Sequence, residues 1–166
     1  MILIGLGGNL DSPRYGTPRA TLEAALVALE ARGIRICARS RWYRTAPVPV
    51  SEQPWFVNLV VRVETDLDPF DLLARLHEIE QEFGRQRDVR NAPRILDLDL
   101  IDYDGKCMDE PDLTLPHPRL QDRAFVLFPL RDVAPGWCHP HSGRSLDALI
   151  ESLPGDQRIE ADGPAA

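Results

Sequence analysis

The clearest structural signal in the chain is residues 56–84, which read FVNLVVRVETDLDPFDLLARLHEIEQEFG. Alternate residues in the first part are apolar, so the side chains at odd positions from Val57 to Val63 share one face of a strand over 56–65. Asp68-Pro69 then combines a capping carboxylate with a proline suited to the first helical position, and Gly84 provides a helix end. The stretch therefore predicts a strand followed directly by a helix.

The same two patterns recur before and after this stretch. Residues 2–7 are a short apolar run before a glycine turn, and Thr17-Pro18 begins a helix that Gly33 ends. Residues 34–44 alternate as a strand, and residues 95–103 form another strand. The predicted order is strand, helix, strand, strand, helix, strand, which is the order of an α+β, ferredoxin-like βαββαβ sandwich.

The remaining sequence predicts a C-terminal extension of this sandwich. An apolar run covers residues 124–130, and Leu146, Leu149 and Ile150 indicate one more short helix. We therefore expect a single domain over residues 1–153 and a frayed tail over 154–166.

Composition excludes several classes of protein. The chain has 166 residues and is 43% hydrophobic, which suits one domain with an ordinary core. It contains no run of about 20 apolar residues, and its first charged residue after the start is Asp11, so we expect neither a membrane span nor a secretory signal. The net charge of −7 disfavours binding to a nucleic-acid backbone. We expect a cytoplasmic monomer whose three cysteines are reduced thiols.

Arginine is almost the only basic residue in the chain. Of the 19 basic residues Lys106 is the only lysine, and the other 18 are arginines, which bind phosphate oxygens in a bidentate manner. Genomic base composition could cause the same bias, so position must decide which arginines matter. Arg85, Arg87 and Arg90 lie in a polar loop and form either a solvated face or a lid that closes on phosphates.

The strongest chemical signal is Pro93-Arg94-Ile95-Leu96-Asp97-Leu98-Asp99-Leu100. Alternation places Asp97 and Asp99 on one face of a strand with Cα atoms about 6.5–7 Å apart. Two carboxylates at this spacing can hold Mg²⁺, which fills its remaining positions with water and phosphate oxygens. The alternative is an edge strand with a solvated acidic face. Arg94 favours the metal site, because acid and guanidinium together suit a metal-bound polyphosphate.

Three further patterns point to ligand binding, each with a structural alternative. His117 and Arg123 flank a proline-containing turn and could both reach phosphate, or could be surface residues. Phe56 and Asn58 share a strand face, where ring and amide could bind a flat heterocycle or could serve the core and strand pairing. Glu80 lies on the apolar stripe of its helix, where an acid is either paired or functional.

Taken in order, these segments resemble the 6-hydroxymethyl-7,8-dihydropterin pyrophosphokinase family. The resemblance covers roughly residues 2–135, and the order of its motifs makes it specific. The matching segments are Gly5-Leu6-Gly7-Gly8-Asn9-Leu10, Ser40-Arg41-Trp42-Tyr43-Arg44-Thr45, Gln53-Pro54-Trp55-Phe56-Val57-Asn58, Ile79-Glu80, Gly84-Arg85, Pro93-Arg94-Ile95-Leu96-Asp97-Leu98-Asp99, and Leu115-Pro116-His117 with Arg123-Ala124-Phe125.

The resemblance implies a role for each matching residue. For the metal and the phosphates, it implies that two Mg²⁺ ions bind Asp97 and Asp99, and that the triphosphate is held by Arg94, His117 and Arg123 with Arg87 from the lid. For the pterin, it implies two stacking rings, a hydrogen-bonding amide and wall contacts, supplied by Phe56, Phe125, Asn58, Thr45 and Gly7. For the adenosine side of ATP, it implies contacts from Leu100, Thr114 and Glu80.

The activity implied by the resemblance is transfer of the diphosphate of ATP to the hydroxymethyl group of a reduced pterin, with release of AMP. ATP would be the co-substrate and Mg²⁺ the cofactor. Two other hypotheses remain at this stage. A ferredoxin-like binding module would bind Mg²⁺ and ATP but never yield AMP. A metal-dependent phosphodiesterase would use the same carboxylates to cleave its substrate without pterin.

Overall fold

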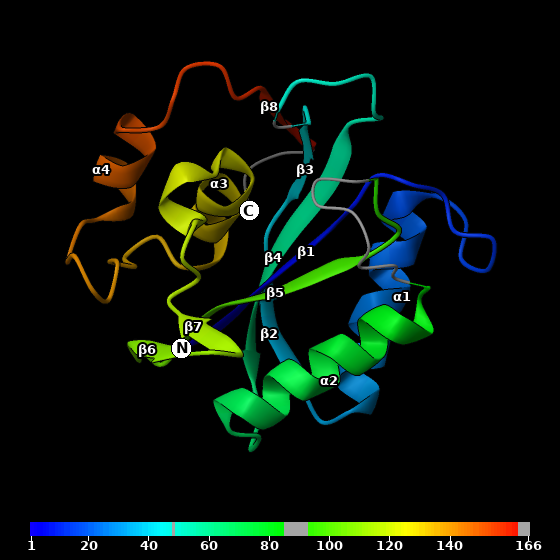
Figure 1. The fold of residues 1–166 in the computed structure, drawn as a ribbon, viewed down its shortest axis with the longest axis horizontal. Helices are drawn as coiled ribbons and strands as arrows, with labels where there is room; N and C mark the ends of the chain where they lie inside the picture. Colours follow the sequence, from blue (N-terminus) through cyan, green and yellow to red (C-terminus); the bar gives the residue numbers. More distant parts are fainter. Residues whose placement is uncertain (48, 85–92, 163–166) are drawn as a thin grey trace.

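The computed structural model describes residues 1–47, 49–84 and 93–162 (Figure 1). In chain order its elements are β1 (Ile2–Gly8), α1 (Pro18–Ala31), β2 (Arg35–Arg39), β3 (Trp42–Thr45), β4 (Phe56–Glu64), α2 (Pro69–Glu82), β5 (Asp97–Tyr103), β6 (Met108–Glu110), β7 (Leu113–Leu115), a 3₁₀ turn (Leu120–Asp122), α3 (Ala124–Val133), α4 (Leu146–Glu151) and β8 (Ile159–Asp162).

An antiparallel sheet forms the centre of the molecule. Its strands follow the order β5-β1-β4-β3-β8, and β2 pairs with β4 next to β3. With four α-helices in the described ranges, this is a mixed α and β protein. When β2 and β3 are counted as one interrupted strand, the order is consistent with the predicted ferredoxin-like arrangement.

The structure confirms both predicted helix starts. The Thr17 hydroxyl accepts a hydrogen bond from Ala20 N at 3.2 Å, and α1 begins with the following proline. The Asp68 carboxylate accepts from Asp71 N at 2.8 Å at the start of α2. Each oxygen satisfies a backbone N–H that has no partner within its helix, which is why these short signals mark the boundaries well.

The single strand predicted over 34–44 is wrong, because it is interrupted at Ser40 and Arg41. Ser40 N donates to Val60 O at 2.9 Å, while the Ser40 hydroxyl accepts from Val60 N at 3.0 Å. The serine side chain thus replaces one backbone group of the ladder. Arg41 N is released from the sheet and donates instead to the Asp132 carboxylate on α3 at 3.0 Å.

The predicted frayed tail over 154–166 is also wrong for its middle part. Residues Ile159–Asp162 form β8, which pairs antiparallel with β3 from Trp42 to Thr45. The unpaired backbone groups on the outer edge of β3 provide the template for this pairing. Three of the four β8 residues are exposed, so their sequence carries no apolar alternation that would indicate a strand.

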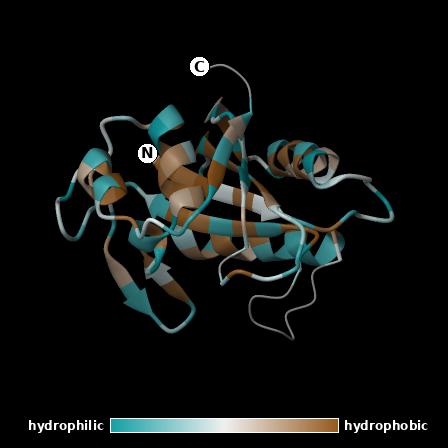
Figure 2. Ribbon diagram, turned by 90° about the horizontal axis from the view of Figure 1, so that it is seen from above, coloured by the Kyte–Doolittle hydropathy of each residue, from teal (hydrophilic) through white to brown (hydrophobic). Residues whose placement is uncertain are grey.

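Helices cover both faces of the sheet, and a separate core lies on each side (Figure 1). Helices α1 and α2 pack on one face over leucines and isoleucines from β1, β4 and β5. Helices α3 and α4 pack on the other face over Leu3, Val60 and Ile101. Figure 2 shows the apolar segments gathered between the sheet and these helices. Among the residues that the structure describes, no helix has both the length and the apolar character needed to cross a bilayer.

Candidate active site

Three neighbouring strands place an amide, a glycine and a carboxylate in one row across the sheet. Asn58 on β4 pairs with Gly7 on β1, and Gly7 pairs with Asp97 on β5. Because adjacent strands lie about 4.8 Å apart, the Asn58 and Asp97 backbones are about 10 Å apart. Two positions back along β1, on the same face, Gly5 pairs with Val60 and with Asp99. The predicted pterin-binding amide and the predicted acid pair thus lie on either side of β1.

Gly7 lets the Asn58 side chain lie close over β1. A Cβ atom added there would lie 2.7 Å from Asn58 Oδ1. Asn58 is 6% exposed, and its Nδ2 donates to Thr45 Oγ1 at 2.7 Å, which fixes the orientation of the amide. Phe56 is partly buried at the start of β4, opposite Thr45 on β3. Four of the residues predicted to contact the pterin are therefore neighbours on adjacent strands.

Arg94 is placed beside the acid pair by its own backbone. Arg94 O accepts from Asn9 N at 2.8 Å and Leu10 N at 3.1 Å, and Arg94 N donates to Asn9 Oδ1 at 2.8 Å. Gly8 lets the backbone of residues 94–95 lie close to the end of β1, since a Cβ at Gly8 would lie 2.4 Å from Ile95 O. The guanidinium then forms an ion pair with Asp97, with Arg94 Nη1 3.6 Å from Asp97 Oδ1.

His117 approaches the same region from the segment after β7. Its backbone N donates to Ile101 O on β5 at 2.9 Å. Burial, followed by the nearby Arg123 charge, lowers the pKa of His117 to about 4, so the ring is neutral at pH 7. Its Nδ1 accepts from Arg119 N at 3.3 Å, which selects the tautomer with hydrogen on Nε2. The free ring nitrogen is therefore a donor, which suits a phosphate oxygen.

Arg123 lies directly before α3, with its guanidinium carbon 5.3 Å from the centre of the Phe125 ring. Burial lowers the pKa of Arg123, while the negative charges of Asp99 and Asp97 oppose that effect. The charge of Asp97 also acts on the His117 ring, as does that of Arg123. Residues from β5, from the segment after β7 and from the start of α3 thus form one electrostatic cluster around the acid pair.

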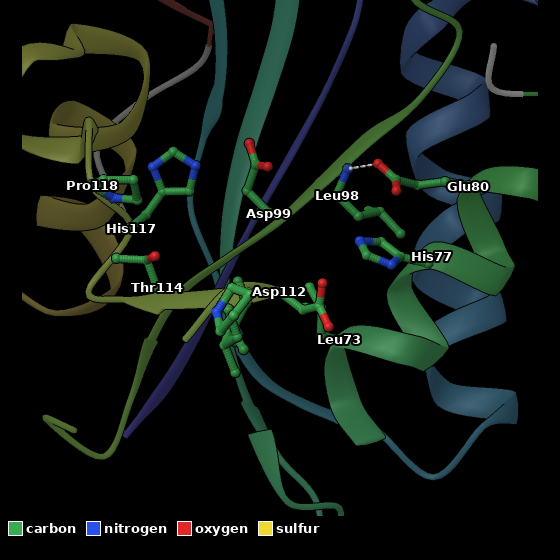
Figure 3. Close-up of a pocket in the computed structure, with 12 residues that line it drawn as sticks. Leu73, His77, Glu80, Leu98, Asp99, Asp112, Thr114, His117 and Pro118 are labelled. Atoms are coloured by element: carbon green, nitrogen blue, oxygen red, sulfur yellow. Dashed lines mark hydrogen bonds between the residues drawn. The ribbon is translucent and has the colours of Figure 1, made fainter. Parts of the chain in front are cut away.

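A cavity of about 280 Å³ lies against β5 and α2 (Figure 3). The predicted adenosine contacts Leu100, Thr114 and Glu80 line it, together with Asp99 and His117 from the phosphate cluster. Glu80 is 1% exposed and accepts a hydrogen bond from Leu98 N at 2.9 Å, which holds it against β5. The cavity therefore connects the adenosine contacts to the acid pair.

Sequence reasoning missed Leu73, His77 and Asp112, which also line this cavity. Figure 3 shows Leu73, His77 and Glu80 projecting from α2, with His117 and Thr114 on the opposite side. Leu73 and His77 precede Glu80 by seven and three positions, so the three share one face of the helix. That spacing was a usable signal for two of the missed residues.

Among the described residues, the two predicted stacking rings do not contact each other. Phe125 packs partly against the core beneath α3, and within the described ranges no ring contact joins it to Phe56. Arg85, Arg87 and Arg90 lie outside the described residues.

The donor set at the acid pair fits Mg²⁺ better than a metal held by the protein alone. The described residues contain no group of three or more His, Cys, Asp or Glu side chains arranged to hold a metal. Two carboxylates on one strand face provide the one or two protein ligands that Mg²⁺ takes when substrate oxygens and water complete its shell. Asp97 and Asp99 would hold the ion.

Comparison with known proteins identifies the family. The model of the 7,8-dihydro-6-hydroxymethylpterin-pyrophosphokinase (HPPK) family matches residues 3–135. The chain is 42% identical to a Synechocystis 2-amino-4-hydroxy-6-hydroxymethyldihydropteridine pyrophosphokinase, over 91% of this chain and 75% of the relative. It is also 42% identical to the Pseudomonas aeruginosa protein of the same name, over 92% of this chain and 91% of the relative.

Solved structures show the same fold. The crystal structure of wild-type Plasmodium falciparum HPPK-DHPS with pteroate superposes with a TM-score of 0.72 at 15% identity, covering 90% of this chain and 43% of that one. The family match and the two relatives show that the chain belongs to the 7,8-dihydro-6-hydroxymethylpterin-pyrophosphokinase family, and the shared fold agrees with this.

Proposed function

We propose that this protein transfers the diphosphate of ATP to the hydroxymethyl group of 6-hydroxymethyl-7,8-dihydropterin in folate biosynthesis. The hydroxymethyl oxygen attacks the β-phosphorus, the bond from that phosphorus to the α,β-bridging oxygen breaks, and AMP leaves while the hydroxyl proton is released. Besides family membership, one observation carries the proposal. Asn58, Gly7 and Asp97 lie in one row across three strands, with the Asn58 and Asp97 backbones about 10 Å apart and no side chain on the residue between them, which supports a pterin on the Asn58 side and metal-bound phosphates on the Asp97 side.

The pterin side of this proposal uses β3, β4 and α3. Asn58 would hydrogen-bond the edge of the pterin, because Thr45 already holds the amide in one orientation. Phe56 and Phe125 would stack on the two faces of the ring. Gly7 would leave room for the hydroxymethyl group to point toward β5.

The phosphate side uses β5 and the two segments that meet it. Arg94 and Arg123 would bind phosphate oxygens by their guanidinium groups, and His117 would donate from Nε2. We propose that Asp97 and Asp99 hold two Mg²⁺ ions with the phosphates; such ions neutralise charge and polarise the reacting groups. The residues would then act mainly by orientation and charge neutralisation.

The remaining ATP contacts lie along the cavity beside α2. Leu100 and Thr114 would contact adenine, and Glu80 would face the adenosine from the helix. Arg87 completes the proposed set, although it lies outside the described residues. We propose further that the ferredoxin-like core and its C-terminal extension work as one catalytic domain and as a monomer.

A coupled assay for AMP release tests the proposal, with ATP, Mg²⁺ and 6-hydroxymethyl-7,8-dihydropterin, and with pterin omitted as the control. We expect AMP only when pterin is present, and loss of that signal in Asp97→Ala but not in Asp66→Ala, an exposed acid outside the site. ATP binding without AMP would support a binding module instead. Nucleotide cleavage without pterin would support a phosphodiesterase.

A further inference from the structure

The C-terminal segment reaches back to the residue proposed to bind the triphosphate. The side-chain amide of Gln157 makes two hydrogen bonds to the backbone on either side of Arg123. Gln157 Oε1 accepts from Ala124 N at 2.8 Å, and Gln157 Nε2 donates to Asp122 O at 2.7 Å. One side chain, more than 30 positions away in sequence, thus brackets Arg123.

This bracket fills a gap at the start of α3. Arg123 is the N-cap residue of the helix, and it provides no side-chain cap. The N–H of Ala124 would otherwise be one of the unpaired donors at a helix start. Arg123 itself has an extended backbone, with φ −119° and ψ 109°. Its N donates to Leu120 O, and its carbonyl accepts from Val126 N and Leu127 N. Gln157 adds to these backbone bonds a side-chain contact that joins both neighbouring peptide groups to one distant residue.

Gln157 is itself held by the sheet. The next residue, Arg158, accepts a hydrogen bond at its carbonyl from Ala46 N at 3.1 Å. The strand β8 follows, and Ile159 pairs with Thr45 on β3. The Arg158 guanidinium also lies over the Trp55 ring, 5.0 Å from its centre. The bracket is therefore anchored on β3 as well as on the start of α3.

We propose that Gln157 is a positioning residue that sets the direction in which Arg123 presents its guanidinium to the phosphates of the nucleotide. The inference rests on the proposed function, in which Arg123 binds the triphosphate. It assigns a role in nucleotide binding to the C-terminal segment, which lies beyond the last residue matched by the family model, residue 135.

The test is a double-mutant cycle on nucleotide binding. Gln157→Leu keeps the size of the side chain and removes both hydrogen bonds. We expect it to weaken binding of a non-hydrolysable ATP analogue with Mg²⁺ by about tenfold, the effect of two ordinary hydrogen bonds. In an Arg123→Ala background the same change should have little effect, because the group that Gln157 orients is gone. Equal losses in both backgrounds would show a merely structural role and overturn the proposal.

Further variants keep the test decisive. Gln157→Asn is too short to reach both peptide groups, so we expect the same pattern from it. It replaces Gln157→Leu if that variant folds poorly. Glu160→Gln is the matched control. Glu160 lies on the same C-terminal segment as Gln157, and its replacement removes only an exposed ion pair to Arg44 on β3. In turnover, the KM for ATP should rise while the KM for pterin stays near the wild-type value. An unchanged KM for ATP in both Gln157 variants would also overturn the proposal.

The outcomes separate this inference from the proposed function. If the wild-type protein binds the analogue but releases no AMP with pterin, the transfer proposal fails while the cycle still reports on Gln157. If the wild-type protein does not bind the analogue at all, both proposals fail.

Discussion

Acidification should destabilise this protein through His117. Burial and the adjacent Arg123 charge lower the pKa of this ring to about 4, whereas the unfolded chain has a value near 6.5. Arg119 acts in the same direction, and Asp97 opposes it. Between these two pKa values the unfolded chain binds a proton that the folded protein does not. Protonation therefore favours unfolding, and stability falls as the pH drops from about 6.5 toward 4.

The magnitude follows from the two pKa values. Their difference corresponds to at most about 3 kcal/mol of stability, since one pKa unit is about 1.4 kcal/mol. Between about pH 7 and about pH 4.5, the contribution of this ring should change by about 2 kcal/mol. Carboxylates titrate over part of the same range, so the effect of His117 has to be measured as a difference between variants.

The assay is urea unfolding of the wild type and of His117→Asn at both pH values, in buffer with a chelator. Asparagine does not titrate, and its carbonyl oxygen can replace Nδ1 as the acceptor for Arg119 N. We expect the wild type to lose about 2 kcal/mol more than the variant on acidification. If both proteins lose the same free energy, His117 is not held neutral by its surroundings and the reasoning is refuted.

Three further predictions concern packing and substrate binding. Gly8→Ala should cost about 1–3 kcal/mol in urea unfolding, because its Cβ would meet Ile95 O at 2.4 Å; Gly136→Ala, with open space around it, should cost far less. Phe125→Ala should weaken pterin binding more than ATP-analogue binding in calorimetry, and equal effects would contradict the stacking role. Asp132→Ala should cost about 1–3 kcal/mol, since it leaves the Arg41 guanidinium and the Tyr43 hydroxyl on β3 without their carboxylate acceptor; an unchanged unfolding midpoint would show that this network is dispensable.

The parts of the fold that could be predicted are those set by local chemistry. Thr17-Pro18 and Asp68-Pro69 mark helix starts because capping depends only on residues within one turn. The parts that could not be predicted depend on distant partners. Strand β8 exists because β3 has a free edge, and the interruption at Ser40 depends on its hydroxyl accepting from Val60 N in place of a backbone carbonyl. Neither partner can be identified from the local sequence.

Strand β5 shows the same limit within one element. Alternation correctly separates Asp97 and Asp99 from the leucines that pack under α2. It fails at the end of the strand, where the register against β1 shifts and Ile101 is left without a partner. Ile101 stays on the face of Asp97 and Asp99 and contributes to the core under α3, whereas the shift brings Asp102 to the same side, where it accepts from Trp137 Nε1 at 2.8 Å. A regular alternation would have placed Asp102 on the opposite face.

The candidate site was easier to predict in composition than in arrangement. Residue types and their spacing indicated the acid pair, the amide and the arginines. The distance between the pterin side and the phosphate side depends instead on the register of β1 with both neighbours, which no local pattern specifies. Asn9 and Gln157 were missed for a related reason, since each acts on the backbone of another segment.

The end of β1 accordingly controls geometry, while the groups proposed to act on the substrates come from other segments. Gly7 has no side chain to fill the space between Asn58 and Asp97, where the two substrates would meet. Gly8 permits the backbone after Arg94 to approach, and Asn9 holds Arg94 through two hydrogen bonds, from Asn9 N to Arg94 O and from Arg94 N to Asn9 Oδ1. The Asn9 side chain also donates from Nδ2 to Pro54 O. A side chain at either glycine would therefore change the separation of the two half-sites while leaving every proposed substrate-binding group in the chain.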